Sequence, residues 1–205
     1  MAKSRPPGQI HTTTEIHAVA VFCGSRTGND PAYREAAQAL GRGLAAAGIR
    51  LVYGGGRIGL MGVLADAALT AGGTVIGVIP EFLTRREVAH TGITEQIVTA
   101  SMHSRKQHMF EAADAFVSLP GGLGTLDETI EIITWRQLGL HRKPVLICDV
   151  AGSAAPFLAT IEAAIAAEFA DPAARELYEV MDSVPAVLRR LAHLHRAARG
   201  EVTRL

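Results

Sequence analysis

The chain lacks an excess of charge of either sign: its 205 residues include 20 lysines and arginines and 20 aspartates and glutamates. There is no run of basic residues that could follow a polyanion, so the sequence predicts no nucleic-acid partner. It also lacks an apolar stretch of about eighteen residues, the length that a membrane-spanning helix needs, so no membrane partner is expected. Any site for an anion must therefore be local.

Cysteine is scarce. Cys23 and Cys148 each end an apolar run and lack the spacing of metal ligands, which predicts two buried, reduced thiols in a cytoplasmic protein. Among the eight histidines we find no ligand spacing, because His103 and His108 are five positions apart and would diverge on a helix. The sequence therefore predicts no metal site.

The first fifteen residues differ in composition from the rest of the chain. Residues 1–15 are rich in proline and threonine and poor in large apolar residues, which is typical of a flexible tail, and they lack the apolar core of a signal peptide. The remaining length suits a single domain able to bury roughly 70% of its unfolded surface. We expect one nucleotide-binding domain over residues 16–197.

Strand-like and helix-like segments alternate through this domain. The expected strands are 17–23, 49–53, 74–79, 94–99, 114–119, 144–148 and 179–182, and the expected helices are 33–47, the segment ending at 71, 102–112, the segment beginning at 126, 154–169 and 185–195. Such alternation predicts the α/β class, with a doubly wound parallel sheet of about seven strands and helices on both faces.

The most informative stretch is the turn Pro120-Gly121-Gly122-Leu123-Gly124-Thr125, which joins an expected strand to a long helix. A glycine-rich turn before a helix N-terminus forms an anion site, because unpaired N–H groups and the positive end of the helix dipole meet there. This pattern predicts a phosphate site. A structural alternative stays open, since Thr125 and Glu128 have the spacing of a capping box.

A second glycine cluster, Gly54 to Gly62, follows the second expected strand. Its glycines match the register of a dinucleotide fingerprint, but the acidic residue that binds ribose is not clearly placed, so we interpret Gly55 and Gly56 as part of a mononucleotide phosphate cradle. Ser25 follows the first expected strand and is a candidate phosphate or ribose ligand, although it is also a residue type that forms turns.

Two cations, Arg105 and Lys106, lie in the first turns of their expected helix, where the helix dipole disfavours positive charge. A nearby anionic ligand would explain them. The polar loop 81–92 could cover a pocket or simply connect two elements.

Three motifs together resemble one known family. These are Met102-His103-x-Arg105-Lys106, Pro120-Gly121-Gly122-x-Gly124-Thr125-x-x-Glu128, and Ile132-Ile133-Thr134-Trp135-x-Gln137-Leu138-Gly139. They are similar to the Lonely Guy (LOG) family of cytokinin riboside 5′-monophosphate phosphoribohydrolases over about residues 19–181. The resemblance implies a Rossmann-like fold, a homodimer, no metal or other cofactor, and cleavage of a nucleoside 5′-monophosphate into a free base and ribose 5-phosphate.

The resemblance also implies roles for individual residues. Arg105 and Glu128 match the family's catalytic pair, and Glu128 lies one helical turn beyond the glycine turn, where a carboxylate could stabilise an oxocarbenium-like ribose. The implied substrate contacts are Glu87, Lys106, Gly122, Leu123, Gly124, Thr125, Leu126, Asp127 and Thr134. Many relatives have glutamate at the position of Asp127, so a contact through the longer side chain is not carried over.

Other functions remain open at this point. A nucleosidase acting on AMP or other purine nucleotides needs the same residues, whereas a non-catalytic carrier of molybdenum cofactor needs the glycine cradle but not Arg105 with Glu128. Chains of this type are sometimes labelled lysine decarboxylases. We reject that label, because Lys3, Lys106 and Lys143, the lysines of the chain, lack a recognisable pyridoxal-phosphate setting.

Overall fold

A computed structural model describes residues 15–84 and 89–202. Within this part, seven strands form one sheet: β1 (Ala18–Phe22), β2 (Arg50–Tyr53), β3 (Val75–Pro80), β4 (Glu95–Thr99), β5 (Ala115–Ser118), β6 (Val145–Cys148) and β7 (Glu179–Met181). The α-helices are α1 (Pro31–Ala46), α2 (Gly59–Thr70), α3 (Met102–Glu111), α4 (Leu123–Gln137), α5 (Ala155–Ala166) and α6 (Val184–Val202), and two 3₁₀ turns are η1 (Glu81–Leu83) and η2 (Pro172–Leu177).

The strands lie in the order β4-β3-β2-β1-β5-β6-β7, and every pair is parallel. From β1 the chain builds outward to β4, and it then returns to place β5 on the other side of β1. The strand order thus reverses between β1 and β5. In open parallel sheets, ligands bind outside the carboxyl ends of the strands at this point of reversal.

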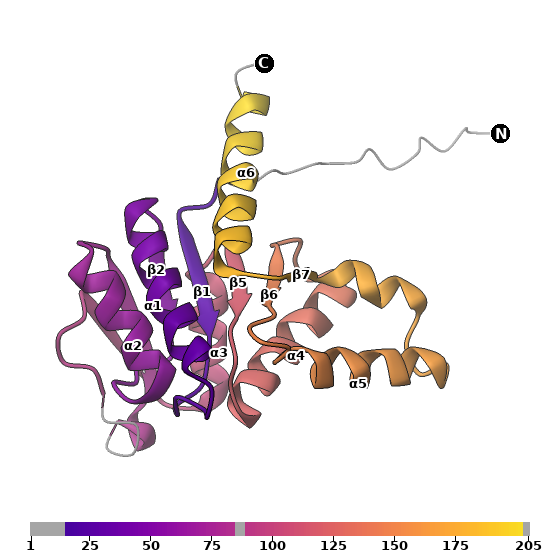
Figure 1. The fold of residues 1–205 in the computed structure, drawn as a ribbon, viewed down its shortest axis with the longest axis horizontal. Helices are drawn as coiled ribbons and strands as arrows, with labels where there is room; N and C mark the ends of the chain where they lie inside the picture. Colours follow the sequence, from indigo (N-terminus) through magenta and orange to yellow (C-terminus); the bar gives the residue numbers. More distant parts are fainter. Residues whose placement is uncertain (1–14, 85–88, 203–205) are drawn as a thin grey trace.

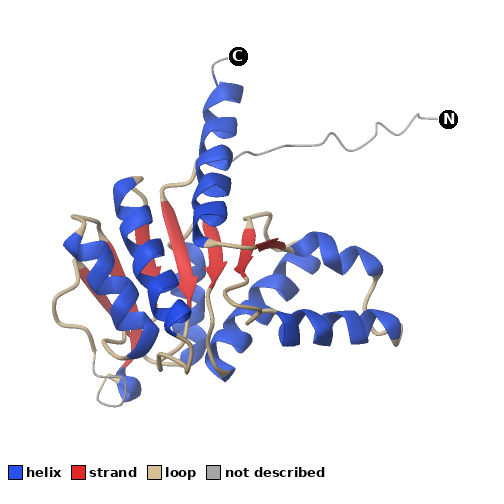
Figure 2. Ribbon diagram, viewed as in Figure 1, coloured by secondary structure: helices blue, strands red, loops and turns tan. Residues whose placement is uncertain are grey.

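Helices cover both faces of the sheet (Figure 1, Figure 2). One core joins alternate strand residues to α1, α2 and α6, and includes Val19, Leu40 and Leu191. The other joins the intervening strand residues to α3, α4 and α5, and includes Phe116 and Ile132. Burial on both faces explains why β1 is a continuous apolar run with all five residues buried.

The predicted fold is confirmed, with element boundaries shifted by one to a few residues at most ends. The largest shift is at the end of α6, which continues to Val202, and α4 begins at Leu123, inside the predicted glycine turn. The predicted flexible tail lies outside the described residues, apart from Glu15. No helix in the described part is long and apolar enough to cross a membrane.

Candidate active site

The glycine turns after β1 and β5 meet at the point where the strand order reverses. The Gly24 amide, just after β1, donates a 3.0 Å hydrogen bond to the carbonyl of Pro120, just after β5. The fold therefore joins Ser25 and the Pro120–Thr125 turn, which are about a hundred residues apart in the chain, at the position where parallel sheets bind ligands.

The N-terminus of α4 forms the floor of this site. Its N-cap is Gly122, which has no side chain that could accept hydrogen bonds from the first amides. The Leu126 amide donates a 3.0 Å hydrogen bond to the Gly122 carbonyl. The preceding amides of Leu123, Gly124 and Thr125 are those that an α-helix leaves without an intrahelical partner. They are available to an anion.

The start of α4 at Leu123 argues against the capping box that the sequence left open. Thr125 is the third residue of α4, and the N-cap is Gly122, which has no side chain to cap the helix. The Thr125 carbonyl accepts a 2.6 Å hydrogen bond from the Thr129 hydroxyl. Thr125 is therefore not the N-cap residue that a capping box with Glu128 requires.

The three glycines of the turn have two different roles. A Cβ atom at Gly121 would overlap the Thr125 hydroxyl and lie 2.9 Å from the Gly24 amide nitrogen, so close packing requires glycine there. At Gly122 and Gly124 an added Cβ would meet no atom within 4 Å. These two positions face open space, which leaves the α4 amides accessible.

Two of the cavities at this end of the sheet share Ser25, Gly122 and Leu123 in their walls. The larger has a volume of about 800 Å³, within the range typical of small-molecule sites. Its walls come from the turns after β1, β5 and β6: Gly24, Ser25, Arg26, Thr27, Gly28, Pro120, Gly121, Gly122, Leu123, Ala151, Gly152 and Ser153, with Tyr33, Leu60 and Pro156. The smaller, of about 130 Å³, reaches Arg105 and Glu128.

Arg105 and Glu128 are buried side by side, with 5% and 7% of each residue exposed. Arg105 Nη2 lies 3.8 Å from Glu128 Oε1 and donates a 3.2 Å hydrogen bond to the Gly54 carbonyl. The Arg105 Nε atom is buried and has no hydrogen-bond partner among the described residues. The predicted catalytic pair is thus brought together at the smaller cavity.

The second glycine cluster contributes through Gly54 rather than through the predicted Gly55 and Gly56. A Cβ atom at Gly54 would overlap Arg105 Nη2, whereas Gly55 and Gly56 are buried and line neither cavity. The first amides of α2, at Leu60 and Met61, both donate to the Gly24 carbonyl. This cluster therefore shapes the site by close packing, and the Leu60 and Met61 amides bind the Gly24 carbonyl in place of a phosphate.

Lys106 is held by two carboxylates of α4. Its ammonium lies 3.1 Å from Asp127 Oδ2 and 3.1 Å from Glu131 Oε1. Partial burial lowers the pKa of Lys106, but the hydrogen bonds to Asp127 and Glu131 outweigh it and leave the pKa above its ordinary value. The helix dipole disfavours Lys106 near the start of α3, and the carboxylates of Asp127 and Glu131 offset this effect. The anion that we predicted near Lys106 is therefore supplied by side chains of α4.

The remaining predicted residues fall into three groups. Ser25 and Leu123 line both cavities, and Gly124 lines the smaller one. Leu126 and Thr134 are exposed on α4 and line neither of these two cavities. Glu87 lies outside the described residues.

Sequence reasoning missed several residues that line the cavities. Cys23 and Met102 contact the smaller one, and Tyr33 and Ser153 the larger one. Cys23 and Ser153 follow β1 and β6, so their positions at carboxyl ends of strands were a signal that could have been used. Tyr33 and Met102 lie on helices and carried no such signal.

Nucleophilic chemistry by Cys23 is disfavoured. Burial, and then the nearby charge of Glu128, raise the pKa of the Cys23 thiol well above its usual range, although the charge of Arg105 acts in the opposite direction. Because the thiolate is the reactive form, a thiol in this setting is inert. Both cysteines are free and buried, as predicted.

The two described lysines also lie away from the cavities. Lys106 is engaged by Asp127 and Glu131, and Lys143 donates a 2.7 Å hydrogen bond to the Phe110 carbonyl. Neither lysine lines the cavities at the glycine turns, so neither is placed to form a Schiff base there. Lys3 lies outside the described residues.

Comparisons with known sequences identify close relatives. A family model described as "Possible lysine decarboxylase" matches residues 61–191. The chain is 49% identical over 159 residues to the cytokinin riboside 5′-monophosphate phosphoribohydrolase of Rhodococcoides fascians, an alignment that covers 77% of this chain and 80% of the relative. It is 44% identical over 180 residues to LOG7 of Arabidopsis thaliana, which bears the same enzyme name, with 88% and 83% covered.

Solved structures of lower identity share the fold. The molybdenum cofactor carrier protein of Chlamydomonas reinhardtii matches with a TM-score of 0.65 at 22% identity, covering 88% of this chain and 98% of that one. The molybdenum cofactor binding protein of Rippkaea orientalis matches with a TM-score of 0.67 at 20% identity and the same coverage. At such identities the likeness shows a common fold and carries no argument about ligands.

Proposed function

Because the chain belongs to the LOG family of cytokinin riboside 5′-monophosphate phosphoribohydrolases, we propose that it hydrolyses the N-glycosidic bond of N6-modified adenosine 5′-monophosphates. The products are the free base, a cytokinin, and ribose 5-phosphate. The observation that carries this proposal is the buried Arg105–Glu128 pair beside the open N-terminus of α4.

The 5′-phosphate binds the amides at the start of α4. The amides of Leu123, Gly124 and Thr125 and the positive end of the helix dipole favour a dianion, and Gly122 and Gly124 leave room for its oxygens. Ser25, across the shared wall of the two cavities, can donate a further hydrogen bond from its hydroxyl.

The ribose then lies toward Glu128. Glu128 follows Thr125 by three residues, which is about 4.5 Å along the helix axis, so its carboxylate and the phosphate-binding amides lie on neighbouring turns. A carboxylate at this distance stabilises positive charge on the ribose as the bond from C1′ to the base nitrogen breaks. It also accepts a proton from the water that adds to C1′.

Arg105 orients the nucleotide and neutralises negative charge that develops on the departing base. A guanidinium does not deprotonate in proteins, so Arg105 is not the acid that protonates the base. Its Nη2 is held by the Gly54 carbonyl, so the guanidinium keeps a fixed orientation at the wall of the smaller cavity.

The decisive experiment measures release of free base by the purified chain. Steady-state kcat/KM is compared for N6-isopentenyl-AMP and AMP, and we expect a preference for the isopentenyl nucleotide. A preference for bare AMP would make the chain a general AMP nucleosidase. Tight binding of a pterin phosphate without release of base from any nucleotide would make it a carrier.

We also propose that two copies of the chain form a homodimer through α4. Leu126 and Ile130 lie four residues apart on this helix and are 40% and 43% exposed, and Leu123, three residues earlier, is 85% exposed. Such an apolar stripe beside the site favours a partner surface. Trp135, farther along the same helix, packs against Phe110 with ring centroids 5.1 Å apart.

Light scattering at micromolar concentration tests the dimer. We expect twice the chain mass for the wild type and a monomer for Ile130→Arg. Phe169→Arg is the matched control, because Phe169 is 90% exposed but lies beyond α5, away from the stripe. A wild-type monomer, or a dimer that Ile130→Arg leaves intact, would contradict the proposal.

We also propose a cytoplasmic location. The two free buried thiols are consistent with it.

A further inference from the structure

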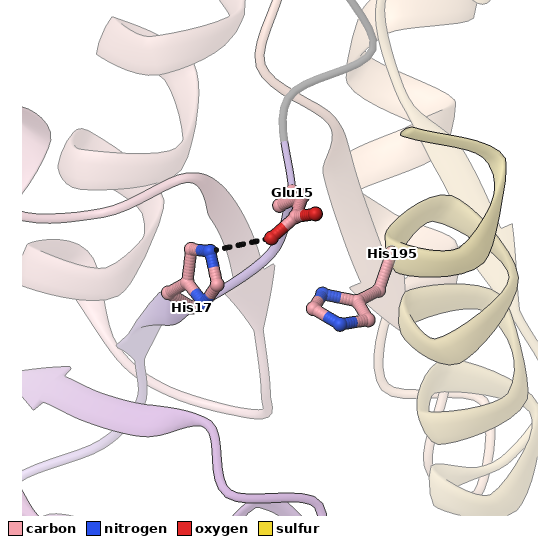
Figure 3. A group of neighbouring side chains, drawn as sticks. All are labelled: Glu15, His17 and His195. Carbon is pink, nitrogen blue, oxygen red and sulfur yellow. Dashed lines mark ion pairs between the residues drawn. The ribbon is translucent and has the colours of Figure 1, made fainter. Parts of the chain in front are cut away.

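Three side chains with metal-binding atoms gather at the end of β1 opposite the glycine turns. Glu15 and His17 precede β1, and His195 lies on α6. One ligand atom from each residue lies within 4.8 Å of the others. Figure 3 shows the carboxylate and the two imidazoles converging from these two segments, with His195 facing the Glu15–His17 pair.

The spacing of these atoms is close to that of a metal site. His17 Nε2 lies 3.0 Å from Glu15 Oε2, and the His17 and His195 rings meet edge to face with centroids 5.6 Å apart. Ligands bound at 2.0–2.1 Å around a tetrahedral ion are separated by roughly 3.3 Å. The Glu15–His17 pair is thus nearly at the required separation, and His195 needs a side-chain movement of about 1.5 Å at most.

A second observation concerns His195 alone. Its Nδ1 atom is buried and has no hydrogen-bond partner among the described residues. Leaving a buried polar atom without a partner is unfavourable, and native structures avoid it. An ion between His195 and the Glu15–His17 pair would give this nitrogen a partner.

We propose that Glu15, His17 and His195 bind one divalent transition-metal ion of the Zn²⁺ type. Two imidazole nitrogens and one carboxylate oxygen suit Zn²⁺, Co²⁺ or Ni²⁺, whereas Mg²⁺ and Ca²⁺ prefer oxygen ligands throughout. Three protein ligands leave a fourth position for water. The ion ties the segment before β1 to the C-terminal helix.

The site is separate from the proposed catalytic centre. His17 and Cys23 lie at opposite ends of β1, and six residues of extended chain span about 20 Å. The ion therefore stabilises the fold without taking part in hydrolysis.

Calorimetric titration of Zn²⁺ into the untagged, chelator-treated full chain tests the site, and visible absorption of bound Co²⁺ reports its ligands. We expect one ion per chain, no heat with Mg²⁺, and at least a tenfold weaker Kd for Zn²⁺ in His195→Gln and in His17→Gln. His193→Gln is the matched control, since His193 is exposed on the same helix and its Nδ1 lies near Arg190 Nη1.

Thermal unfolding supplies an independent readout. Zn²⁺ raises the Tm of the wild type and of His193→Gln but not that of His195→Gln, because an ion that binds the folded state stabilises it. Hydrolytic turnover stays unchanged in all three variants. The proposal is overturned if no stoichiometric binding occurs at micromolar Zn²⁺, or if His195→Gln and His17→Gln bind it as tightly as the wild type.

Discussion

Arg105 Nη2 lies 3.8 Å from Glu128 Oε1, although the two residues belong to helices that follow different strands. This separation exceeds the 2.7–2.9 Å of a charge-assisted hydrogen bond, so the charges are adjacent without a direct bond between these two atoms. The carbonyl of Gly54, at the end of β2, fixes the guanidinium instead. The geometry of the Arg105–Glu128 pair therefore depends on segments that follow three different strands, β2, β4 and β5.

Gly54→Ala tests the positioning of Arg105. The added Cβ would overlap Arg105 Nη2, and the backbone at Gly54 is not in the left-handed region, so displacement of the guanidinium is the main expected effect. We expect kcat to fall on the order of tenfold or more, because misplaced catalytic groups lose much of their effect. The measurement is kcat on N6-isopentenyl-AMP, with circular dichroism to verify the fold. Wild-type kcat in this variant would contradict the assigned role of Gly54.

Gly122→Ala should affect nucleotide binding, whereas Gly121→Ala should affect the packing of the glycine turn. A methyl group at Gly122 enters open space above the first α4 amides, so we expect KM for the nucleotide to rise with little change in Tm. The same group at Gly121 overlaps Thr125 and crowds the Gly24 amide, so we expect a lower Tm. Nucleotide titration and thermal unfolding of both variants provide the comparison. Equal KM for Gly122→Ala and the wild type would place the phosphate elsewhere.

The fold and the location of the candidate site were predictable from the sequence, because both follow from local patterns. Apolar runs predict strands, and a glycine turn before a helix predicts an anion site even without coordinates. The start of α4 was placed too late, since the Thr125–Glu128 spacing also suited a helix start.

Contacts between distant segments were not predictable. The sequence could not show that Gly54, rather than Gly55 or Gly56, packs against Arg105, nor that Asp127 and Glu131 hold Lys106. The cluster of Glu15, His17 and His195 joins nearly opposite ends of the chain, so spacing rules for metal ligands could not detect it. Such pairings depend on tertiary packing rather than on local sequence.

Acid should destabilise the fold through His141. Its Nε2 donates to the Ile132 carbonyl at 2.8 Å, and its Nδ1 accepts from the Lys143 amide at 3.1 Å, so the neutral ring fits the site. Burial, together with the charges of Arg136 and Lys143, lowers the pKa of His141, although the bond to Ile132 acts in the opposite direction. Between the folded pKa and the unfolded value of about 6.5, the unfolded chain binds more protons.

The contribution of His141 to stability is therefore present above about pH 6.5 and is lost as the pH falls below it. Urea unfolding at pH 7.5 and 5.5 measures the effect. His141→Phe, which keeps the ring contacts with Phe110 and Phe116, should show a smaller pH dependence than the wild type. An unchanged pH dependence in this variant would assign the acid sensitivity to other groups.

The 5′-phosphate should be essential for turnover. Without it, the amides at the start of α4 face a bound nucleoside that cannot accept their hydrogen bonds. Sites built to bind a polar group discriminate against analogues that lack it by roughly 10⁴-fold. We expect kcat/KM for AMP to exceed that for adenosine by about this factor. Initial rates of adenine release on the two compounds test this, and comparable rates would refute phosphate binding at α4.

Glu128→Gln should remove catalysis while leaving nucleotide binding largely intact. The side chain keeps its shape but loses the charge that stabilises the oxocarbenium ion and activates water, so we expect kcat to fall on the order of 10²–10⁴-fold. Because Glu128 is not part of a capping box, the start of α4 should be unaffected. The change also leaves the buried Arg105 without this neighbouring charge, so a moderate decrease in Tm accompanies it.

Asp127→Asn is the matched control for this change. Asp127 is the preceding residue of α4, about 100° away around the helix axis, and its exposed carboxylate binds Lys106, which Glu131 continues to hold. Net charge changes equally in the two variants, but the carboxylate lost from Asp127 lines neither cavity at the glycine turns. We therefore expect near wild-type kcat for Asp127→Asn. If both variants lost activity to the same extent, the effect would arise from the general electrostatic potential around α4, and Glu128 would have no specific role at the ribose.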